Sequence, residues 1–264
     1  MNNCQRIFSG PVLALFATAS FAIAGDPPQS NEAEAVANAA IAQLAGWQTK
    51  AARKTLEAKK DKYGSDSDFK TAWALLEIQE AAAAGKPAPG SSTATLAQMT
   101  KAQKVDAAAQ YWQGEYFYQQ QKNNEANAAW QAAAKSAGQL VATNPNDATA
   151  QFYLGAALVR QKKYDPALKA LRLAVRGGFN EAMVNQQIGF IYLFQQKWKE
   201  AKDAFDLGLT VDPRFAPMYY WRAMAWEKLG RKDNLLLDLD QFVKLAPKAP
   251  EANKARAILK SAGG

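Results

Sequence analysis

The chain has 264 residues, enough for one or two domains with a sizeable core, and its 32 basic and 24 acidic residues give a formal charge of +8. It contains no histidine, and its one cysteine is Cys4. This composition leaves no residues for disulfides within the chain or for histidine-based catalysis, and it removes the commonest zinc ligands. We therefore expect no metal, no cofactor and no catalytic residues of these types.

The N-terminal segment has the form of a signal peptide. One basic residue, Arg6, precedes the apolar run PVLALFATASFAIA, and the run ends in Ala22-Ile23-Ala24, with small residues at the two positions that signal peptidase reads. At about 14 residues the run is too short to cross a bilayer as a helix. We expect residues 1–24 to be cleaved, against the alternative of an uncleaved anchor. The protein is then exported, to the periplasm or, as the alternative, out of the cell.

Residues 25–84 are predicted to be helical, as a degenerate repeat or a separate cap, and residues 85–97 have the composition of a linker. Basic residues gather between Lys50 and Lys62. A solvated helix face is the simplest interpretation of this run. Contact with an anionic membrane surface is the functional alternative, whereas export argues against a nucleic-acid partner.

A repeat with a step of 34 residues dominates the second half of the chain. The step links three small residues to one another, two alanines to each other, and two prolines to each other. These matches are Gly155, Gly189 and Ala223; Ala167 and Ala201; and Pro213 and Pro247. Large apolar residues follow the same step at Leu171, Phe205 and Leu239. We expect Gly189 and Ala201 to face each other where two helices cross.

On these residues the chain resembles the tetratricopeptide repeat family, whose units are helix-turn-helix pairs of the same length. The resemblance implies an all-α solenoid, a right-handed superhelix, with repeats at 148–181, 182–215 and 216–249. The third repeat departs from the family pattern at Arg222, Leu235 and Phe242, and the first has Phe179 in place of the closing proline.

Two further segments flank these repeats. Residues 98–147 resemble an atypical repeat whose second helix is extended, followed by a turn in which Asp147 is the N-cap of the next helix. Residues 250–264 place Ala255, Ile258 and Leu259 on one helical face, which is typical of a capping helix that shields the last repeat.

The resemblance places a set of mainly aromatic residues on the concave face of the superhelix. Within the run IGFIYLF it assigns Ile188 and Tyr192 to the core and Phe190 and Phe194 to the concave face. The candidate binding residues are Tyr111, Trp112, Tyr118, Phe152, Tyr153, Arg160, Gln186, Gln187, Phe190, Phe194, Tyr220, Trp221, Met224 and Lys228. The competing interpretation is that these rings pack between adjacent helices or are covered by the N-terminal helices.

We expect a non-enzymatic adaptor that binds a peptide or a partner helix in this aromatic groove, during assembly of envelope or secretion machinery. A glycan or lipid ligand of the same groove is the alternative, and a second copy of the chain could also close it. Hydrolysis by paired carboxylates has only Glu115 and Glu227 as candidates on this face, and we expect them to lie too far apart.

Overall fold

The computed structural model describes residues 29–99 and 106–262, and in these residues all regular structure is helical. The predicted signal peptide, residues 1–24, lies outside the described residues. The N-terminal helices are α2 (Gln29–Ala45), α3 (Thr49–Glu57), α4 (Lys60–Tyr63), α5 (Ser67–Ala83) and α6 (Gly90–Met99). They are followed by α7 (Ala107–Gln119), α8 (Asn123–Thr143), α9 (Ala148–Arg160), α10 (Tyr164–Arg176), α11 (Glu181–Phe194), α12 (Trp198–Val211), α13 (Ala216–Lys228), α14 (Lys232–Leu245) and α15 (Ala252–Ala262). The predicted all-α class is confirmed.

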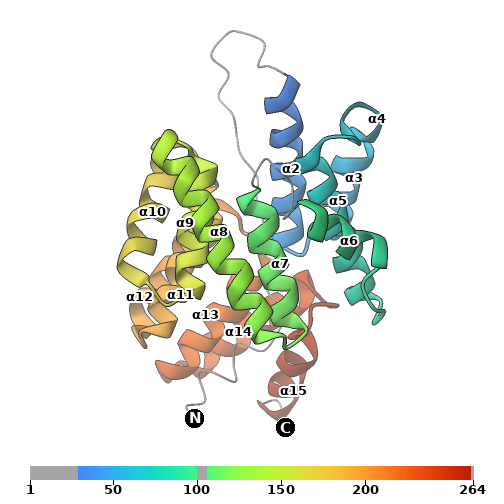
Figure 1. Cartoon of the computed structure of the whole chain (residues 1–264). Coiled ribbons are helices and arrows are strands. Elements are labelled where there is room, and N and C mark those ends of the chain that lie inside the picture. Colours follow the sequence, from blue (N-terminus) through green and yellow to red (C-terminus); the bar gives the residue numbers. More distant parts are fainter. Residues whose placement is uncertain (1–28, 100–105, 263–264) are drawn as a thin grey trace.

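From α7 onward the helices pack as consecutive pairs, α7 with α8, α9 with α10, α11 with α12 and α13 with α14. The second helix of each pair packs on the first helix of the next pair, which joins the pairs into one coil. Figure 1 shows this coil running from α7 and α8 in the centre, through α9 to α12 on the left, to α13 and α14 at the bottom. This is the stacked helix-pair solenoid that the 34-residue step predicts.

Each pair turns at a residue in the left-handed region. The φ angles are 60° at Gln121, 60° at Lys162, 59° at Gln196 and 70° at Gly230. The next backbone N–H then reaches back across the turn, as when that of Lys163 donates to the carbonyl of residue 158 at 3.0 Å. This is a Schellman-type helix end, and from Lys162 through Gln196 to Gly230 it recurs with the same 34-residue step, whereas Gln121 lies 41 residues before Lys162. Only the last of the four positions is glycine, so sequence alone does not mark the turn.

The second helix of the first pair is longer than its counterparts. The sequence predicts an extended helix here, and α8 has 21 residues against 13 in α10 and 14 in α12. Asp147 then caps α9 as predicted, because its Oδ1 accepts the N–H of Ala150 at 2.8 Å.

Close approach within the first three pairs depends on a glycine of the first helix, whereas α13 has Ala223 at this position. A Cβ placed on Gly189 would lie 2.4 Å from the ring of Phe205, and one on Gly114 would lie 2.4 Å from the ring of Trp130. Gly155 meets Leu171 in the same way, at 2.7 Å. The nearest side chain to Gly189 is therefore that of Phe205, one helical turn beyond Ala201 on α12, and the expected contact with Ala201 stays a prediction.

The N-terminal helices form their own packed group and share one buried core with the repeats. Helix α2 packs on α3 and α5, and Gln79 of α5 donates from Nε2 to the carbonyl of Leu44 at 2.8 Å inside that contact. The group also reaches the second repeat, 182–215, where Nε2 of Gln48 lies 3.5 Å from Oδ2 of Asp212. Figure 1 shows these helices on the right, across the molecule from α10 and α12.

The segment 85–97, predicted to be a linker, contains most of helix α6. Only its first residues are non-helical, and α6 begins at Gly90 directly after Pro89. Proline is tolerated at this point because it precedes the first helical hydrogen bonds. Ser92 and Leu96, one helical turn apart, are both buried, and α6 packs on α5.

Helix α15 packs on α14 at the other end of the coil. Ala255 is buried, and Ile258 and Leu259 are half-buried on the same face. Glu251 lies directly before this helix, and its Oε1 is buried without a hydrogen-bond partner in the described part of the chain. Burial raises the pKa of its carboxyl group from the ordinary 4.5 to about 7, an effect that a backbone hydrogen bond and Lys254 partly oppose.

Replacing the glycine at one helix crossing should destabilise the protein. Gly189→Val places a side chain against Phe205, and we expect the free energy of unfolding to fall by about 1–3 kcal/mol. Gly138→Ala is the control, because nothing lies within 4 Å of a Cβ there and Gly138 is helical. This control should change stability by no more than about 1 kcal/mol, in the stabilising direction. Urea unfolding measures both, and equal effects would contradict the crossing geometry.

The stability of the cap should depend on pH through Glu251. The folded protein binds this proton more tightly than the unfolded chain, so the free energy of unfolding falls as the pH rises from about 4.5 through 7. We expect Glu251→Gln to be more stable than the parent at pH 8, on the order of 1–3 kcal/mol, and equal to it at pH 4. Urea unfolding at several pH values tests this, with Glu200→Gln on the exposed face of α12 as the control. A pH-independent difference would show that Glu251 is not the titrating group.

Candidate functional site

The structure buries most of the predicted concave residues. Ten of the fourteen are buried, namely Tyr111, Trp112, Phe152, Tyr153, Gln186, Gln187, Phe190, Tyr220, Trp221 and Met224. Tyr118, Arg160 and Phe194 are half-buried, and Lys228 is exposed. The prediction of an open aromatic surface is therefore wrong for these ten residues.

Contacts between the rings give the physical reason. Tyr111 of α7 lies 5.9 Å from Tyr153 of α9, and Phe190 of α11 lies edge-on at 5.4 Å from Trp221 of α13. Phe152 stacks on Phe179 at 4.4 Å between ring centroids. Such pairs add about 0.5–1.5 kcal/mol each beyond the burial of their area. The rings therefore join successive first helices to one another.

The run IGFIYLF shows how the resemblance misled. Phe190, assigned to the concave face, also lies 6.2 Å from Phe205 on the second helix of its own pair. Ile188 and Tyr192, assigned to the core, are only half-buried. Phe194 is half-buried and stacks on Tyr164 of α10 at 6.2 Å. The aromatic residues at every second position of α11 pack on different helices, because α10, α12 and α13 all contact this helix.

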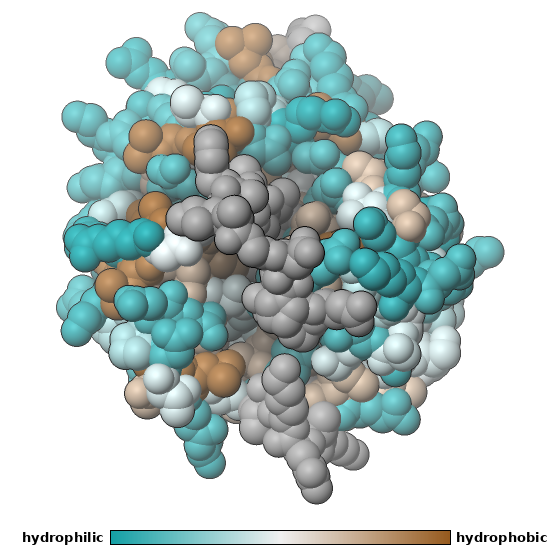
Figure 2. Space-filling view, turned by 90° about the horizontal axis from the view of Figure 1, so that it is seen from above, coloured by the Kyte–Doolittle hydropathy of each residue, from teal (hydrophilic) through white to brown (hydrophobic). Residues whose placement is uncertain are grey.

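Hydrophobic exposure lies instead on the second helices of the pairs. Among the described residues the exposed large hydrophobic side chains are Leu140, Leu207, Val211 and Leu237. All four belong to second helices, α8, α12 and α14. On the visible part of the face in Figure 2, hydrophobic residues form separate patches among hydrophilic ones and no continuous stripe.

The two charged members of the predicted set, Arg160 and Lys228, each lie next to a carboxylate of the protein itself. Arg160 and Glu115 form a two-point ion pair, with Nε 2.7 Å from Oε1 and a second contact from Nη2 to Oε2. Their side chains are 7% and 2% exposed, so the pair is closed to a ligand. Lys228 stays exposed, with its Nζ 3.9 Å from Oε2 of Glu227. Neither carboxylate of the hydrolase hypothesis therefore faces the other across a cleft.

Gln186 is the one residue of the predicted set whose side-chain amide has both a donor and an acceptor without a hydrogen-bond partner in the described part of the chain. It is fully buried, and neither Nε2 nor Oε1 has a hydrogen-bond partner in the described part of the chain. A buried group left in this state costs about 1–3 kcal/mol. The interior of the coil at α11 therefore retains a donor and an acceptor.

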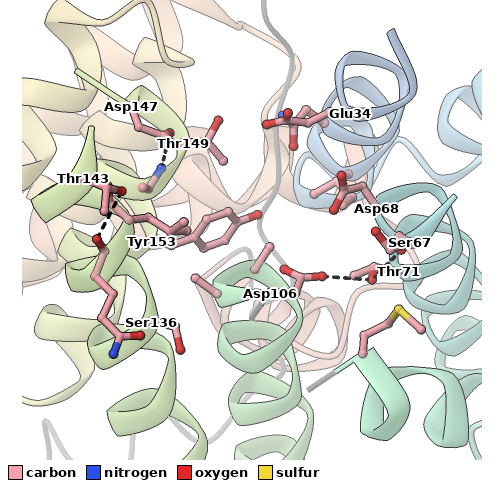
Figure 3. Close-up of a pocket in the computed structure, with 18 residues that line it drawn as sticks. Glu34, Ser67, Asp68, Thr71, Asp106, Ser136, Thr143, Asp147, Thr149 and Tyr153 are labelled. Atoms are coloured by element: carbon pink, nitrogen blue, oxygen red, sulfur yellow. Dashed lines mark hydrogen bonds between the residues drawn. The ribbon is translucent and has the colours of Figure 1, made fainter. Parts of the chain in front are cut away.

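A cleft of about 440 Å³ lies between the N-terminal helices and the first repeats. Helices α2, α5 and α6 form one wall, and α7, α8 and α9 form the other. Its lining residues are Glu34, Asn38, Ile41, Ser67, Asp68, Thr71, Met99, Asp106, Ala107, Ala108, Ser136, Gln139, Leu140, Thr143, Asp147, Thr149, Ala150 and Tyr153. Figure 3 shows Tyr153 reaching into this space from α9, toward Asp106 and the residues of α5.

Helix starts fix the polar groups of the cleft. Asp106 caps α7, since its Oδ1 accepts the N–H of Ala109 at 2.9 Å, and its Oδ2 lies 3.5 Å from Oγ1 of Thr71. The hydroxyl of Tyr153 accepts a hydrogen bond from Nε1 of Trp112 at 3.3 Å. Burial raises the pKa of Tyr153 well above its ordinary value, and the carboxylates of Asp106 and Asp68 add to this rise.

The sequence did not reveal this cleft. Of the fourteen predicted residues only Tyr153 lines it. In the sequence, aspartates at helix starts are typical N-caps, and the repeat pattern does not indicate where the N-terminal helices pack. The acidic residues at the starts of α5, α7 and α9 were the one sequence signal of the cleft.

The basic segment between Lys50 and Lys62 is largely engaged within the protein. Arg53 pairs with Glu57 and Glu80, and both Lys59 and Lys62 pair with Glu32. Lys60 lies over the ring of Trp73 at 4.3 Å. Lys50 and Lys54 stay exposed on α3. Membrane contact through this segment stays a prediction.

Within the described ranges, 29–99 and 106–262, no group of three or more His, Cys, Asp and Glu residues is arranged to hold a metal ion. No helix in that part of the chain is both long enough and apolar enough to cross a membrane.

Comparison by sequence identifies one family. A tetratricopeptide repeat model matches residues 122–180, a range that contains the whole of α8, α9 and α10. No curated protein matches the chain.

Comparison by structure extends the similarity over more of the chain. The APC/C hetero-tetramer Cut9–Hcn1 matches with a TM-score of 0.51 and 16% identity, over 88% of this chain and 45% of that one. A thermophilic tetratricopeptide repeat protein of Thermus thermophilus has a TM-score of 0.49 and 21% identity, over 65% and 88% of the two chains. YrrB, described as a tetratricopeptide repeat protein with an unusual peptide-binding site, has a TM-score of 0.40 and 18% identity, over 76% and 97%.

The first of these matches shows the fold, although this chain spans less than half the length of the matched one. Together with the helix pairs at a 34-residue step, it shows a tetratricopeptide-type solenoid fold, and residues 122–180 match the tetratricopeptide repeat model itself.

Proposed function

We propose that this protein is an exported, non-enzymatic scaffold that holds a peptide segment of a partner protein in the cleft between the N-terminal helices and the first repeats. Tetratricopeptide repeats are interaction modules, which supports the general class. The site is argued from the geometry of this chain.

The cleft is the observation that carries the proposal. Its volume of about 440 Å³ is within the range of small-ligand pockets, roughly 300–1,000 Å³, and suits one or two side chains of a peptide. Helices form both walls, so the site is largely pre-formed and binding orders few protein groups. Ile41, Leu140 and Met99 supply apolar area, and carboxylate, amide and hydroxyl groups supply polar contacts.

The other ligand classes have less support. A glycan or lipid in the inner groove would stack on its rings, but Phe190, Tyr220 and Trp221 are each no more than 2% exposed. Carboxylate-based hydrolysis would need two facing acids, and Glu115 is committed to Arg160.

Export rests on the signal-like residues 1–24, with the small residues Ala22 and Ala24 before the expected cleavage point. The absence of cysteine from residues 25–264 suits a chain that crosses into an oxidising compartment without forming disulfides. We place the protein in the periplasm, where a peptide-holding scaffold would serve the assembly of envelope or secretion machinery.

Site-specific crosslinking tests the proposal. A photoreactive residue at Gln139, an exposed position of α8 on the cleft, should give discrete adducts with a partner protein in the envelope fraction. The same residue at Asp203, exposed on α12, should not give them. Ala108→Trp fills the cleft from α7 and should reduce the Gln139 adducts at least tenfold.

The variant must keep its far-UV helix signal and its melting temperature within a few degrees of the parent for this comparison. Adducts that survive Ala108→Trp, or that form equally from Asp203, would contradict binding in the cleft.

A further inference from the structure

The C-terminal cap carries a carboxyl group at the point where it joins the coil. Helix α15 packs on α14 at the C-terminal end of the coil (Figure 1), and Glu251 lies directly before the first turn of α15. Oε1 of Glu251 is buried and has no hydrogen-bond partner in the described part of the chain. An ionised carboxylate in this position would lose hydration without gaining a partner for that oxygen, so the docked cap favours the protonated group.

The nearest titratable groups do not remove this preference. Burial raises the pKa of the Glu251 carboxyl group to about 7, although a backbone hydrogen bond and the charge of Lys254 on α15 oppose the rise. On α13, Tyr220 lies within electrostatic reach of Glu251. Burial first, and then the charges of Glu251 and Glu227, raise the pKa of its hydroxyl group. The side of the cap that faces α13 therefore supplies no cation to Glu251.

The other charged groups next to the cap have partners or are exposed to solvent. Lys244 of α14 pairs with Asp240 at 2.5 Å, and Lys248 is exposed in the connection between α14 and α15. Arg256 of α15 donates from Nη2 to the carbonyl oxygen of Pro247 in that connection at 2.5 Å. Among the described residues, none of these cations forms an ion pair with Glu251.

The apolar contact that holds the cap on the coil is small. Ala252 and Ala255 are the buried residues of α15, and Ile258 and Leu259 are half-buried. Alanine buries little apolar area, so this contact is weaker than the ring contacts that join the repeats. A terminal element held in this way can open while the rest of the protein stays folded.

We propose that α15 is a pH-sensitive latch on the end of the coil. With Glu251 protonated, α15 stays docked on α14. With Glu251 ionised, α15 leaves this position, the carboxylate becomes hydrated, and the adjoining part of α13 and α14 is uncovered. This part contains Tyr220 and Phe242, whose ring centroids lie 5.2 Å apart.

The direction and the range of the response follow from proton binding. The docked cap binds the proton of Glu251 with a pKa of about 7, and the released cap binds it with the ordinary value of 4.5. Docking is therefore fully favoured below pH 4.5, weakens as the pH rises to 7, and changes little above that. The equilibrium constant for release should be up to about 300-fold larger at pH 8 than at pH 4.

Hydrogen–deuterium exchange in the full-length chain measures release of the cap. The parent and Glu251→Gln are compared at the same pH, because the intrinsic exchange rate then cancels. The ratio of parent to variant exchange rates for the amides of α15 should rise at least tenfold between pH 4 and pH 8. The same ratio for the amides of α9 and α11 should stay constant, because these helices do not open with the cap.

Two further variants test whether the charge of Glu251 is responsible. Glu227→Gln removes an exposed carboxylate from α13 and should leave the pH dependence of α15 exchange as in the parent. Lys254→Gln removes the charge that opposes the effect of burial. It should enlarge the pH dependence in the parent and have no such effect in combination with Glu251→Gln.

Three results would overturn the proposal. A ratio for α15 that does not depend on pH would mean that Glu251 does not titrate in the docked cap. An equal change in α9, α11 and α15 would mean that Glu251 acts only on unfolding of the whole chain. Loss of the pH dependence in Glu227→Gln would assign the response to a different carboxylate.

Discussion

The coil depends on close approach between the two helices of a pair, which in the first three pairs occurs at a glycine covered by a large side chain. Gly114 lies under Trp130, Gly155 under Leu171 and Gly189 under Phe205, and each contact leaves no room for a Cβ. Because this contact draws the pair together on one side, the first helices can pack on one another through their rings. The aromatic content of the first helices therefore serves the continuity of the solenoid.

This use of the rings moves the candidate binding site from the middle of the coil to its beginning. Within the repeats each helix pair meets a similar pair, and the surfaces match. At the start, the first pair meets α2, α5 and α6, which follow no 34-residue step, and a cleft remains between the two groups. Three carboxylates of its lining, those of Asp68, Asp106 and Asp147, come from helix starts, so local folding rules place them on the wall of the cleft.

Sequence periodicity was sufficient for the helix pairs, because small and large residues recur at positions fixed by helix packing. The turn residues before Ala148 were sufficient to predict Asp147 as the cap of α9. Periodicity did not single out Phe205 as the side chain nearest to Gly189, and it was wrong at Phe190, whose ring contacts both Phe205 and Trp221. It also failed at residues 90–97, whose glycine, serine and threonine content hid the helix that packs on α5. The cleft could not be predicted, because it depends on how two groups without a common repeat dock.

Hydroxyl-radical footprinting of the chain of residues 25–264 tests the central claim, that the inner rings are core and not a docking surface. Two neighbouring pairs make the comparison internal: Tyr220 with Tyr219, and Trp221 with Trp226, in which the first member is buried and the second half-buried. The account predicts oxidation of Tyr220 and Trp221 at least several-fold slower than that of their neighbours. Equal oxidation rates within both pairs would contradict the account. They would mean that the inner face is open to solvent, as the predicted aromatic binding groove requires.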